Sequence, residues 1–231
     1  MLLVTLMYGF GARIGELLGL TLEDLYSVTI DGVRCYYLAL RNRMSDRRYQ
    51  HAKNKPHVSD KSQYYLNYYI NSTGKLFITE DMFNKLSDFI SHCAISNSLN
   101  ENSKYNETVA DIVNPKGKMK ENHYVFVNPD GSLLKITKWN SNLRKYYEEA
   151  GIDVDFKIRI NNLNHRLRHG FAMFYVKEGN IDPIALQKLM RHKSFTSTNT
   201  YFNPTLKDQS EIIEEYGKFF LELLENKDER K

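Results

Sequence analysis

Cysteine is scarce in this chain, whose 231 residues include only Cys35 and Cys93. The two form no CxxC pair and have no His-rich neighbourhood at zinc spacing, so the sequence predicts neither a disulfide framework nor a structural metal site. Long apolar runs are also lacking: no stretch approaches the roughly 18 consecutive apolar residues of a membrane span. The apolar start MLLVTLMYGF has neither a basic region before it nor a cleavage site after it. We therefore expect a cytoplasmic protein that contacts no membrane.

The charge of the chain is unevenly distributed. The net charge is +4, from 32 basic and 28 acidic residues. The tail at 205–231 holds 5 basic and 8 acidic residues, so the 27 basic and 20 acidic residues before it give +7. Segment 34–61 has eight basic residues against two acidic ones, interleaved with Tyr36, Tyr37 and Tyr49. Such a segment is either a solvated face or a surface for a phosphate backbone, and composition alone leaves both interpretations open.

Periodicity and turn residues predict a mostly helical chain with one hairpin, and the 42% hydrophobic content is enough for one main core. Residues 26–40 are β-branched and aromatic around Asp31-Gly32, which indicates an antiparallel hairpin, and a basic strand or loop follows to about Val58. A polar loop is expected at 97–106, and a short extended segment ending in a turn at 124–135. Helices are predicted at 2–10, 62–70, 79–95 and 137–150.

Histidines and an arginine gather on one face of a further predicted helix. Asn164 is its candidate N-cap, and His165, Arg168 and His169 then follow at i, i+3 and i+4. Two helical hairpins would fold His192 and Tyr201 back toward this face. The expected boundaries are Gly179 at the end of the first helix, Asp182-Pro183 and Met190 at the two ends of the second, and Ser194 or Thr196 at the start of a third that bears Tyr201.

These residue types allow three interpretations. Taken singly, each side chain is more often structural than catalytic. His165 and His169 match the spacing of zinc ligands on a helix, but the glutamate of HExxH is absent and the cationic Arg168 lies between them. Taken together, histidine, arginine and tyrosine suit a phosphodiester that is attacked by a phenol.

Several separated motifs resemble the catalytic domain of the tyrosine recombinases, the phage integrase family. GFGARIGELLGLTLEDL resembles the family's first arginine motif, HRLRHGFA its HxLRH motif, and LMRH and TNTY its last two motifs, in the family's order and spacing over Leu2 to about Asn203. The resemblance implies a mainly α fold with a small antiparallel β-sheet (α+β). The residues that match are Arg13, Glu16, His165, Arg168, His169, His192 and Tyr201.

The chain departs from the family pattern at two places. Met190-Arg191 replaces the usual Leu-Gly before His192, and Gly11-Ala12 replaces the usual residues before Arg13. Neither change removes a reactive group. The family also has a lysine on the hairpin after the first arginine, for which Lys53 is the favoured candidate and Lys55 the alternative.

The resemblance implies a transesterification that uses no metal, ATP or other cofactor. Tyr201 would attack the scissile phosphate, form a 3′-phosphotyrosine and release a 5′ hydroxyl. Arg13 and Arg168 would bind the non-bridging oxygens, and Lys53 would protonate the leaving oxygen. The supporting roles would be proton transfer from Tyr201 by His165, a hydrogen bond to the phosphate from His192, and positioning by Glu16 and His169.

The implied function is site-specific recombination or integration of a mobile element. A type IB-like topoisomerase and a catalytically silent DNA-binding module are the alternatives. The expected partners are double-stranded DNA and further protomers, from dimer to tetramer, on the nucleoid. We expect a catalytic domain at 1–204, without the family's upstream DNA-clamping domain, and a C-terminal amphipathic helix and tail at 205–231 that docks in its own domain or in a neighbouring protomer.

Overall fold

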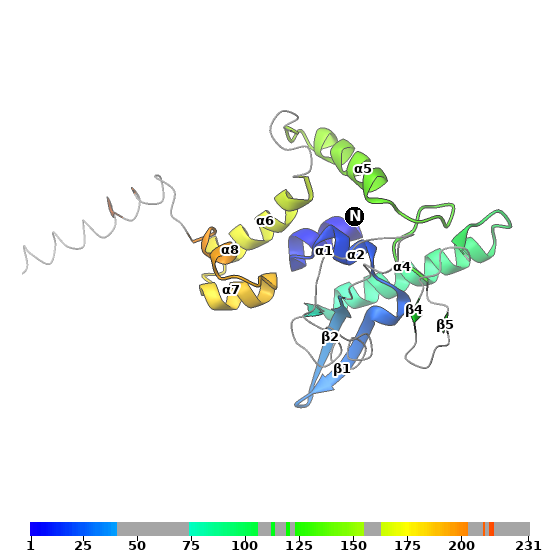
Figure 1. The fold of residues 1–231 in the computed structure, drawn as a ribbon, viewed down its shortest axis with the longest axis horizontal. Coiled ribbons are helices and arrows are strands. Elements are labelled where there is room, and N and C mark those ends of the chain that lie inside the picture. The colour runs from blue at the N-terminus through cyan, green and yellow to red at the C-terminus, as the bar shows by residue number, and fades with distance from the viewer. Residues whose placement is uncertain are drawn as a thin grey trace, which may run out of the picture.

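The computed structural model describes residues 1–40, 74–105, 123–154 and 163–202, together with 112–113, 119–120, 210 and 213–214. Helices α1 and α2 lie near the centre of the molecule, the β1–β2 hairpin extends on one side, and α6, α7 and α8 lie together on another (Figure 1). The elements are α1 (Leu2–Phe10), α2 (Ile14–Leu18), a 3-10 turn (Leu22–Asp24), β1 (Leu25–Ile30), β2 (Val33–Ala39), β3 (Lys75–Ile78), α4 (Glu80–Ser98), β4 (Ile112–Val113), β5 (Met119–Lys120), α5 (Ile136–Glu149), α6 (Leu163–Lys177), α7 (Pro183–Met190) and α8 (Thr196–Asn199).

The predicted hairpin is confirmed. Asp31 and Gly32 both have positive φ values, 50° and 79°, and join antiparallel strands β1 and β2 from the pair Ile30↔Val33 to the pair Leu25↔Leu38. A left-handed conformation at both central residues matches the right-handed twist of the strands. Strand β3 adds to the other edge of β2 and completes a three-stranded antiparallel sheet in the order β1-β2-β3. The sequence did not predict β3, and the basic strand or loop expected up to Val58 lies outside the described residues, as does the helix expected at 62–70.

The helix expected at 79–95 is confirmed as α4, whose N-cap Thr79 accepts a hydrogen bond from the backbone N–H of Met82. The polar loop was predicted too early, because α4 continues to Ser98. Asn97 is buried, and it stabilises the extra turn by donating to the carbonyl of Cys93 and accepting from Ser103 Oγ. The loop therefore begins at Leu99 and not at Asn97.

Helix α6 includes Leu163, the residue before the predicted cap, so the prediction for Asn164 is wrong. Asn164 lies inside the helix, where its Oδ1 accepts from Trp139 Nε1 at 2.7 Å and its Nδ2 donates to Asn140 Oδ1 at 2.7 Å. The side chain is thus committed to α5 and not to its own helix end. Helix α5 itself ends as predicted, at a left-handed Gly151 with φ 67°.

The boundaries of α7 and the start of α8 at Thr196 are confirmed, but the expected placement of Tyr201 within α8 is wrong. Asp182 caps α7 by accepting from the backbone N–H groups of Ile184 and Ala185. Helix α8 ends at Asn199, so Tyr201 lies in the turn that follows and not within the helix. The predicted boundary at residue 204 falls outside the described residues and stays a prediction.

One main hydrophobic core lies around α1 and α2 and includes residues of β2, α4, α5 and α6. A smaller core between α6 and α7 consists of Phe171, Ala172, Leu186 and Met190, with Tyr201 packed against it. Gly11 lets α1 approach α6 closely: its φ is 65°, and a Cβ there would lie 2.7 Å from the Phe171 ring. None of the described helices combines the length and the apolar character that a membrane span needs.

Candidate active site

Arg13 and Glu16 form the first part of the site, at the start of α2. Glu16 accepts from both the backbone N–H and the Nη1 of Arg13, each at 2.8 Å. The Glu16 side chain is 1% exposed, whereas that of Arg13 is 33% exposed. A buried carboxylate thus binds both the backbone and the guanidinium of an arginine whose side chain still reaches solvent. This confirms the predicted contact between Glu16 and an arginine.

Arg168 projects from α6 into the interior and is almost fully buried. Its Nη1 donates to the carbonyl of Gly11 and its Nη2 to the carbonyl of Met190. Burial lowers the Arg168 pKa to about 9, and the nearby charges of Arg13 and Arg191 act in the same direction. Arg168 therefore stays cationic at neutral pH while it joins α1, α6 and the end of α7.

Arg191 is a member of the site that the sequence did not assign. It occupies the C-cap of α7 in a left-handed conformation, with φ 51° and ψ 43°. Its Nη2 donates to Glu16 Oε2 at 2.8 Å and to the Gly11 carbonyl at 3.1 Å. The signal in the sequence was the arginine that stands where the resembling family has glycine, a residue that adopts the left-handed conformation readily.

Three arginines thus surround one buried carboxylate. Burial alone would raise the Glu16 pKa, but the charges of Arg191, Arg13 and Arg168 outweigh it and lower the pKa to about 2. Glu16 is therefore ionised at neutral pH. With three cations against one anion, the cluster keeps a positive charge that suits an anionic ligand.

His192 follows Arg191 and faces the aromatic ring of Tyr201. Its Nδ1 lies 2.9 Å from Thr198 Oγ1, and its ring centroid lies 6.3 Å from that of Tyr201. Partial burial lowers the His192 pKa to about 4, assisted by the charges of Arg168 and the other two arginines. The imidazole is therefore neutral at pH 7.

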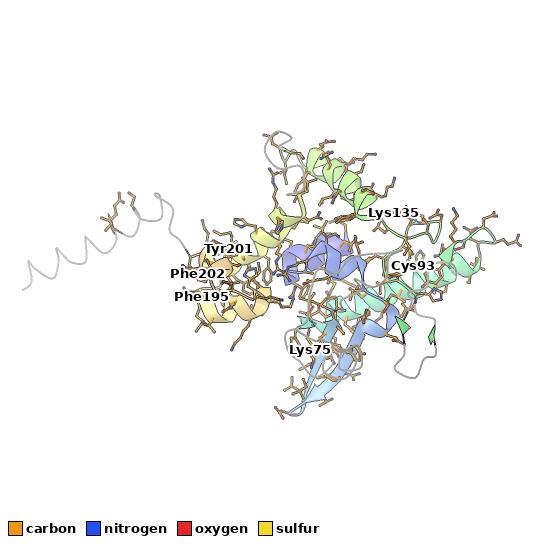
Figure 2. The ribbon with its side chains drawn as sticks, in the orientation of Figure 1. Lys75, Cys93, Lys135, Phe195, Tyr201 and Phe202 are labelled. Atoms are coloured by element: carbon orange, nitrogen blue, oxygen red, sulfur yellow. The ribbon has the colours of Figure 1, made fainter. Side chains whose placement is uncertain are left out.

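The Tyr201 ring lies near two histidines and packs against the small core of α6 and α7. Its ring centroid is 5.1 Å from that of His169 on α6, and the two rings are tilted by 41°. Figure 2 shows Tyr201 beside α8, next to Phe202. Partial burial raises the Tyr201 pKa, while the charges of Arg168 and Arg13 oppose this rise. The phenol is thus protonated at neutral pH and needs a base before it can act as a nucleophile.

His165 lies on the exposed part of α6, on the same helix face as Arg168 and His169. Its pKa is lowered by partial desolvation of the ring and by the positive charges of Arg168 and Arg13. The ring is predominantly neutral at pH 7 and can accept a proton.

Comparison with known proteins decides the family. The sequence model described as "Phage integrase family" matches residues 90–207, just over half of the chain. The chain belongs to the phage integrase family. A region of 97 residues is 34% identical to tyrosine recombinase XerD of Corynebacterium glutamicum, covering 42% of this chain and 29% of that protein. This agreement confirms the resemblance that the motifs indicated.

Solved structures share the fold of this phage integrase family member. The XerA recombinase structure is 17% identical over 93% of this chain and 57% of its own, with a TM-score of 0.53. The XerH site-specific recombinase, bound to its palindromic difH substrate, is 19% identical over 93% of this chain and 44% of its own, with a TM-score of 0.52. These likenesses confirm the mainly α fold with a small antiparallel sheet. The chain spans less than two thirds of the length of each of these relatives.

Of the predicted site residues of this integrase family member, the structure brings seven together and leaves one untested. The lysine candidates, Lys53 and Lys55, belong to the segment between β2 and β3 and lie outside the described residues. Among the residues that are described, no group of three or more His, Cys, Asp or Glu side chains could hold a metal ion. The seven that the fold brings together are Arg13, Glu16, His165, Arg168, His169, His192 and Tyr201.

Proposed function

We propose that this chain is a site-specific DNA recombinase or integrase that cleaves and rejoins DNA strands through a 3′-phosphotyrosine intermediate. The observation that carries this proposal is the position of Tyr201, whose ring stacks on that of His192, contacts that of His169 and lies beside a cluster of arginines. A phenol, neutral imidazoles and guanidinium groups are the parts that a metal-independent phosphoryl transfer needs.

The arginines would bind the scissile phosphate. Arg13 is partly exposed, and Glu16 accepts hydrogen bonds from its backbone N–H and its Nη1. The guanidinium is therefore oriented before any ligand arrives. Arg168 is fixed by the Gly11 and Met190 carbonyls and contributes its positive charge from a buried position. Planar guanidinium groups pair with non-bridging phosphate oxygens and stabilise the extra negative charge of the pentavalent transition state.

The chemical step conserves the number of phosphodiester bonds. The Tyr201 Oη forms a bond to phosphorus as the bond from phosphorus to the 5′ oxygen breaks. The phenolic proton passes to the neutral ring of His165, and the 5′ oxygen takes a proton from Lys53, with Lys55 as the alternative donor. Attack by the 5′ hydroxyl of a second strand on the phosphotyrosine reverses the step and rejoins the DNA.

His192 would hold the phosphate by a hydrogen bond. The neutral tautomer in which Nδ1 accepts from Thr198 Oγ1 carries its proton on Nε2, and we propose that this is the active tautomer. That N–H can donate to a phosphate oxygen. His169 would fix the Tyr201 ring by its tilted ring contact, without proton transfer of its own.

The proposed partners are double-stranded DNA and other copies of this chain, from dimer to tetramer, bound to DNA in the cytoplasm on the nucleoid. The uneven charge supports a DNA partner, since the chain before residue 205 has a net charge of +7. Strand exchange needs at least two cleaved strands, which is why more than one protomer is required.

A library of nicked duplexes with a randomised centre tests this function without a known target site. Cleavage near the nick frees a short oligonucleotide and traps the protein on the DNA. The wild-type chain should give adducts that resist detergent and share a recovered sequence, and Tyr201→Phe should give none. Tyr175→Phe is the matched control, because Tyr175 packs in the same small core. Adducts with unrelated sequences would favour a topoisomerase, and adducts from Tyr201→Phe would contradict the proposal.

A further inference from the structure

The backbone of Arg191 is in a conformation that arginine does not favour. With φ 51° and ψ 43° it is left-handed, and it ends α7 directly before His192. Side chains with a Cβ avoid this region, and glycine is the usual residue at such a helix end. An arginine here has to be stabilised by what its side chain does.

The Arg191 side chain is almost completely buried, with 5% exposure, and bridges two parts of the site. Its Nη2 reaches Glu16 Oε2 at 2.8 Å and the Gly11 carbonyl at 3.1 Å. The Nε is also buried and has no hydrogen-bond partner among the described residues. A third bond runs from Nη1 to the carbonyl of Leu189 at 3.1 Å, within the same helix end. A buried guanidinium with an unsatisfied donor is costly, and of the contacts described here the ion pair with Glu16 is the one that offsets its charge.

Glu16 connects Arg191 to Arg13. Its Oε1 accepts from Arg13 Nη1, and its Oε2 accepts from both the Arg13 backbone and Arg191. Gly11 makes a second connection, because its carbonyl accepts from both Arg168 and Arg191. The segment that carries His192 is thereby joined to the turn that carries Arg13, although the two are far apart in sequence.

We propose that Arg191 is a positioning residue, which fixes Glu16 and, through it, the Arg13 side chain relative to the segment that carries His192. This role rests on the proposed function of the site. It differs from the roles of Arg13 and Arg168, because Arg191 acts through Glu16 and does not touch the phosphate. The family pattern has glycine at this position, so the contact between Arg191 and Glu16 departs from that pattern.

Loss of the guanidinium has a defined electrostatic consequence. The charged groups that face Glu16 are Arg13 from the start of α2, Arg168 from α6 and Arg191 from the end of α7. Without Arg191, burial of the carboxylate is opposed by two cations instead of three, so Glu16 takes up a proton at a higher pH. A protonated Glu16 loses acceptor capacity, and Arg13 is then less firmly held.

Two substitutions separate charge from backbone conformation. Arg191→Gly removes the guanidinium and places a residue there that tolerates the left-handed conformation. Arg191→Lys keeps the charge and the conformation but loses the planar fork. Asn180→Gly is the matched control, because Asn180 is another left-handed residue, with φ 45°, beyond the end of α6.

The first measurement follows the Glu16 carboxyl carbon by NMR between pH 3 and 7, with no DNA present. We expect no Glu16 inflection in the wild-type chain or in Asn180→Gly, an inflection in that range for Arg191→Gly, and an intermediate curve for Arg191→Lys. Identical titrations of wild type and Arg191→Gly would overturn the proposal. If Arg191→Gly does not fold, Arg191→Gln, which removes the charge and keeps most of the side chain, takes its place: a curve that matches wild type overturns the proposal as well.

The second measurement uses the DNA sequence recovered with the wild-type chain. Arg191→Gly should slow adduct formation at saturating protein on the order of tenfold to a hundredfold, the range for a misplaced reacting group, while non-covalent DNA affinity stays within about twofold. Arg191→Lys should recover part of the rate. A rate for Arg191→Gly equal to that of Asn180→Gly would overturn the positioning role alone. An absence of adducts in the wild-type chain would contradict the proposed function, and the carboxyl titration would still decide the role of Arg191.

Discussion

Arg168 on α6 donates a hydrogen bond to the carbonyl of Gly11, which lies 157 residues earlier in the chain. The bond joins the first arginine motif to the second, and it depends on the close approach of α1 to α6. That approach depends in turn on Gly11, because its φ is 65° and a Cβ there would lie 2.7 Å from the Phe171 ring. The geometry of the arginine cluster is therefore set by packing at a glycine.

Gly11→Ala should destabilise the protein by about 1–3 kcal/mol, the range for strain at a left-handed position combined with overpacking. The added Cβ would lie 2.7 Å from the Phe171 ring. Gly9→Ala is the control, since a Cβ at Gly9 meets nothing within 4 Å and alanine is the better helix former. Urea unfolding of both variants measures the difference. Equal stability of Gly11→Ala and wild type would contradict the account of this contact.

His165 predicts a pH dependence of cleavage. Its pKa is lowered from 6.5, so the neutral base is already present at pH 7 and is lost only as the pH falls through the lowered value. The ratio of the wild-type rate of adduct formation to that of His165→Gln should be large and constant from pH 8 to 7 and should fall toward pH 5. A ratio that stays constant down to pH 5 would remove His165 from the proton transfer.

His192 predicts a pH dependence of stability. The folded state keeps the His192 pKa near 4, below the unfolded value of 6.5, so the unfolded chain binds the proton more tightly between these values. Stability is complete above pH 6.5 and decreases as the pH falls toward 4. His192→Gln should lose less stability than wild type between pH 7 and 5 in urea unfolding, whereas His92→Gln, at an exposed position on α4, should behave like wild type. Parallel losses in all three proteins would contradict the assignment.

The general acid can be tested by changing the leaving group. A substrate whose bridging 5′ oxygen is replaced by sulfur has a leaving group that needs no proton, so it should restore cleavage by Lys53→Ala. Arg168→Ala should not be restored, because its defect lies in phosphate binding. Restoration of Lys55→Ala in place of Lys53→Ala would assign the acid to Lys55.

Local signals in the sequence predicted local structure correctly. Asp31-Gly32 specifies its hairpin and Asp182-Pro183 its helix start, because each acts on the backbone within a few residues. Asn164 has the same capping chemistry as Asp182, yet it binds Trp139 and Asn140 instead, a choice set by the packing of α5 on α6. Short-range rules do not contain that information.

The candidate site was predictable as a set of residues and not as a network. The spacing of HRLRH on a helix and of Tyr201 after His192 is visible in the sequence. The role of Arg191 is not, because it depends on a left-handed backbone and on Glu16, 175 residues away. Burial of Arg168 was also not predicted, since nothing local indicates that two distant carbonyls would accept from its guanidinium.

The most direct test of the central claim is to locate the DNA on the protein. An adduct formed on the recovered duplex is digested with nuclease and trypsin, and the peptides are sequenced by mass spectrometry. Cleavage after Lys193 and Lys207 gives the peptide SFTSTNTYFNPTLK, in which Tyr201 is the single tyrosine. The account predicts a nucleotide phosphate on Tyr201 of this peptide. A nucleotide on any other residue, or an unmodified peptide in a preparation that is fully attached to DNA, would contradict it.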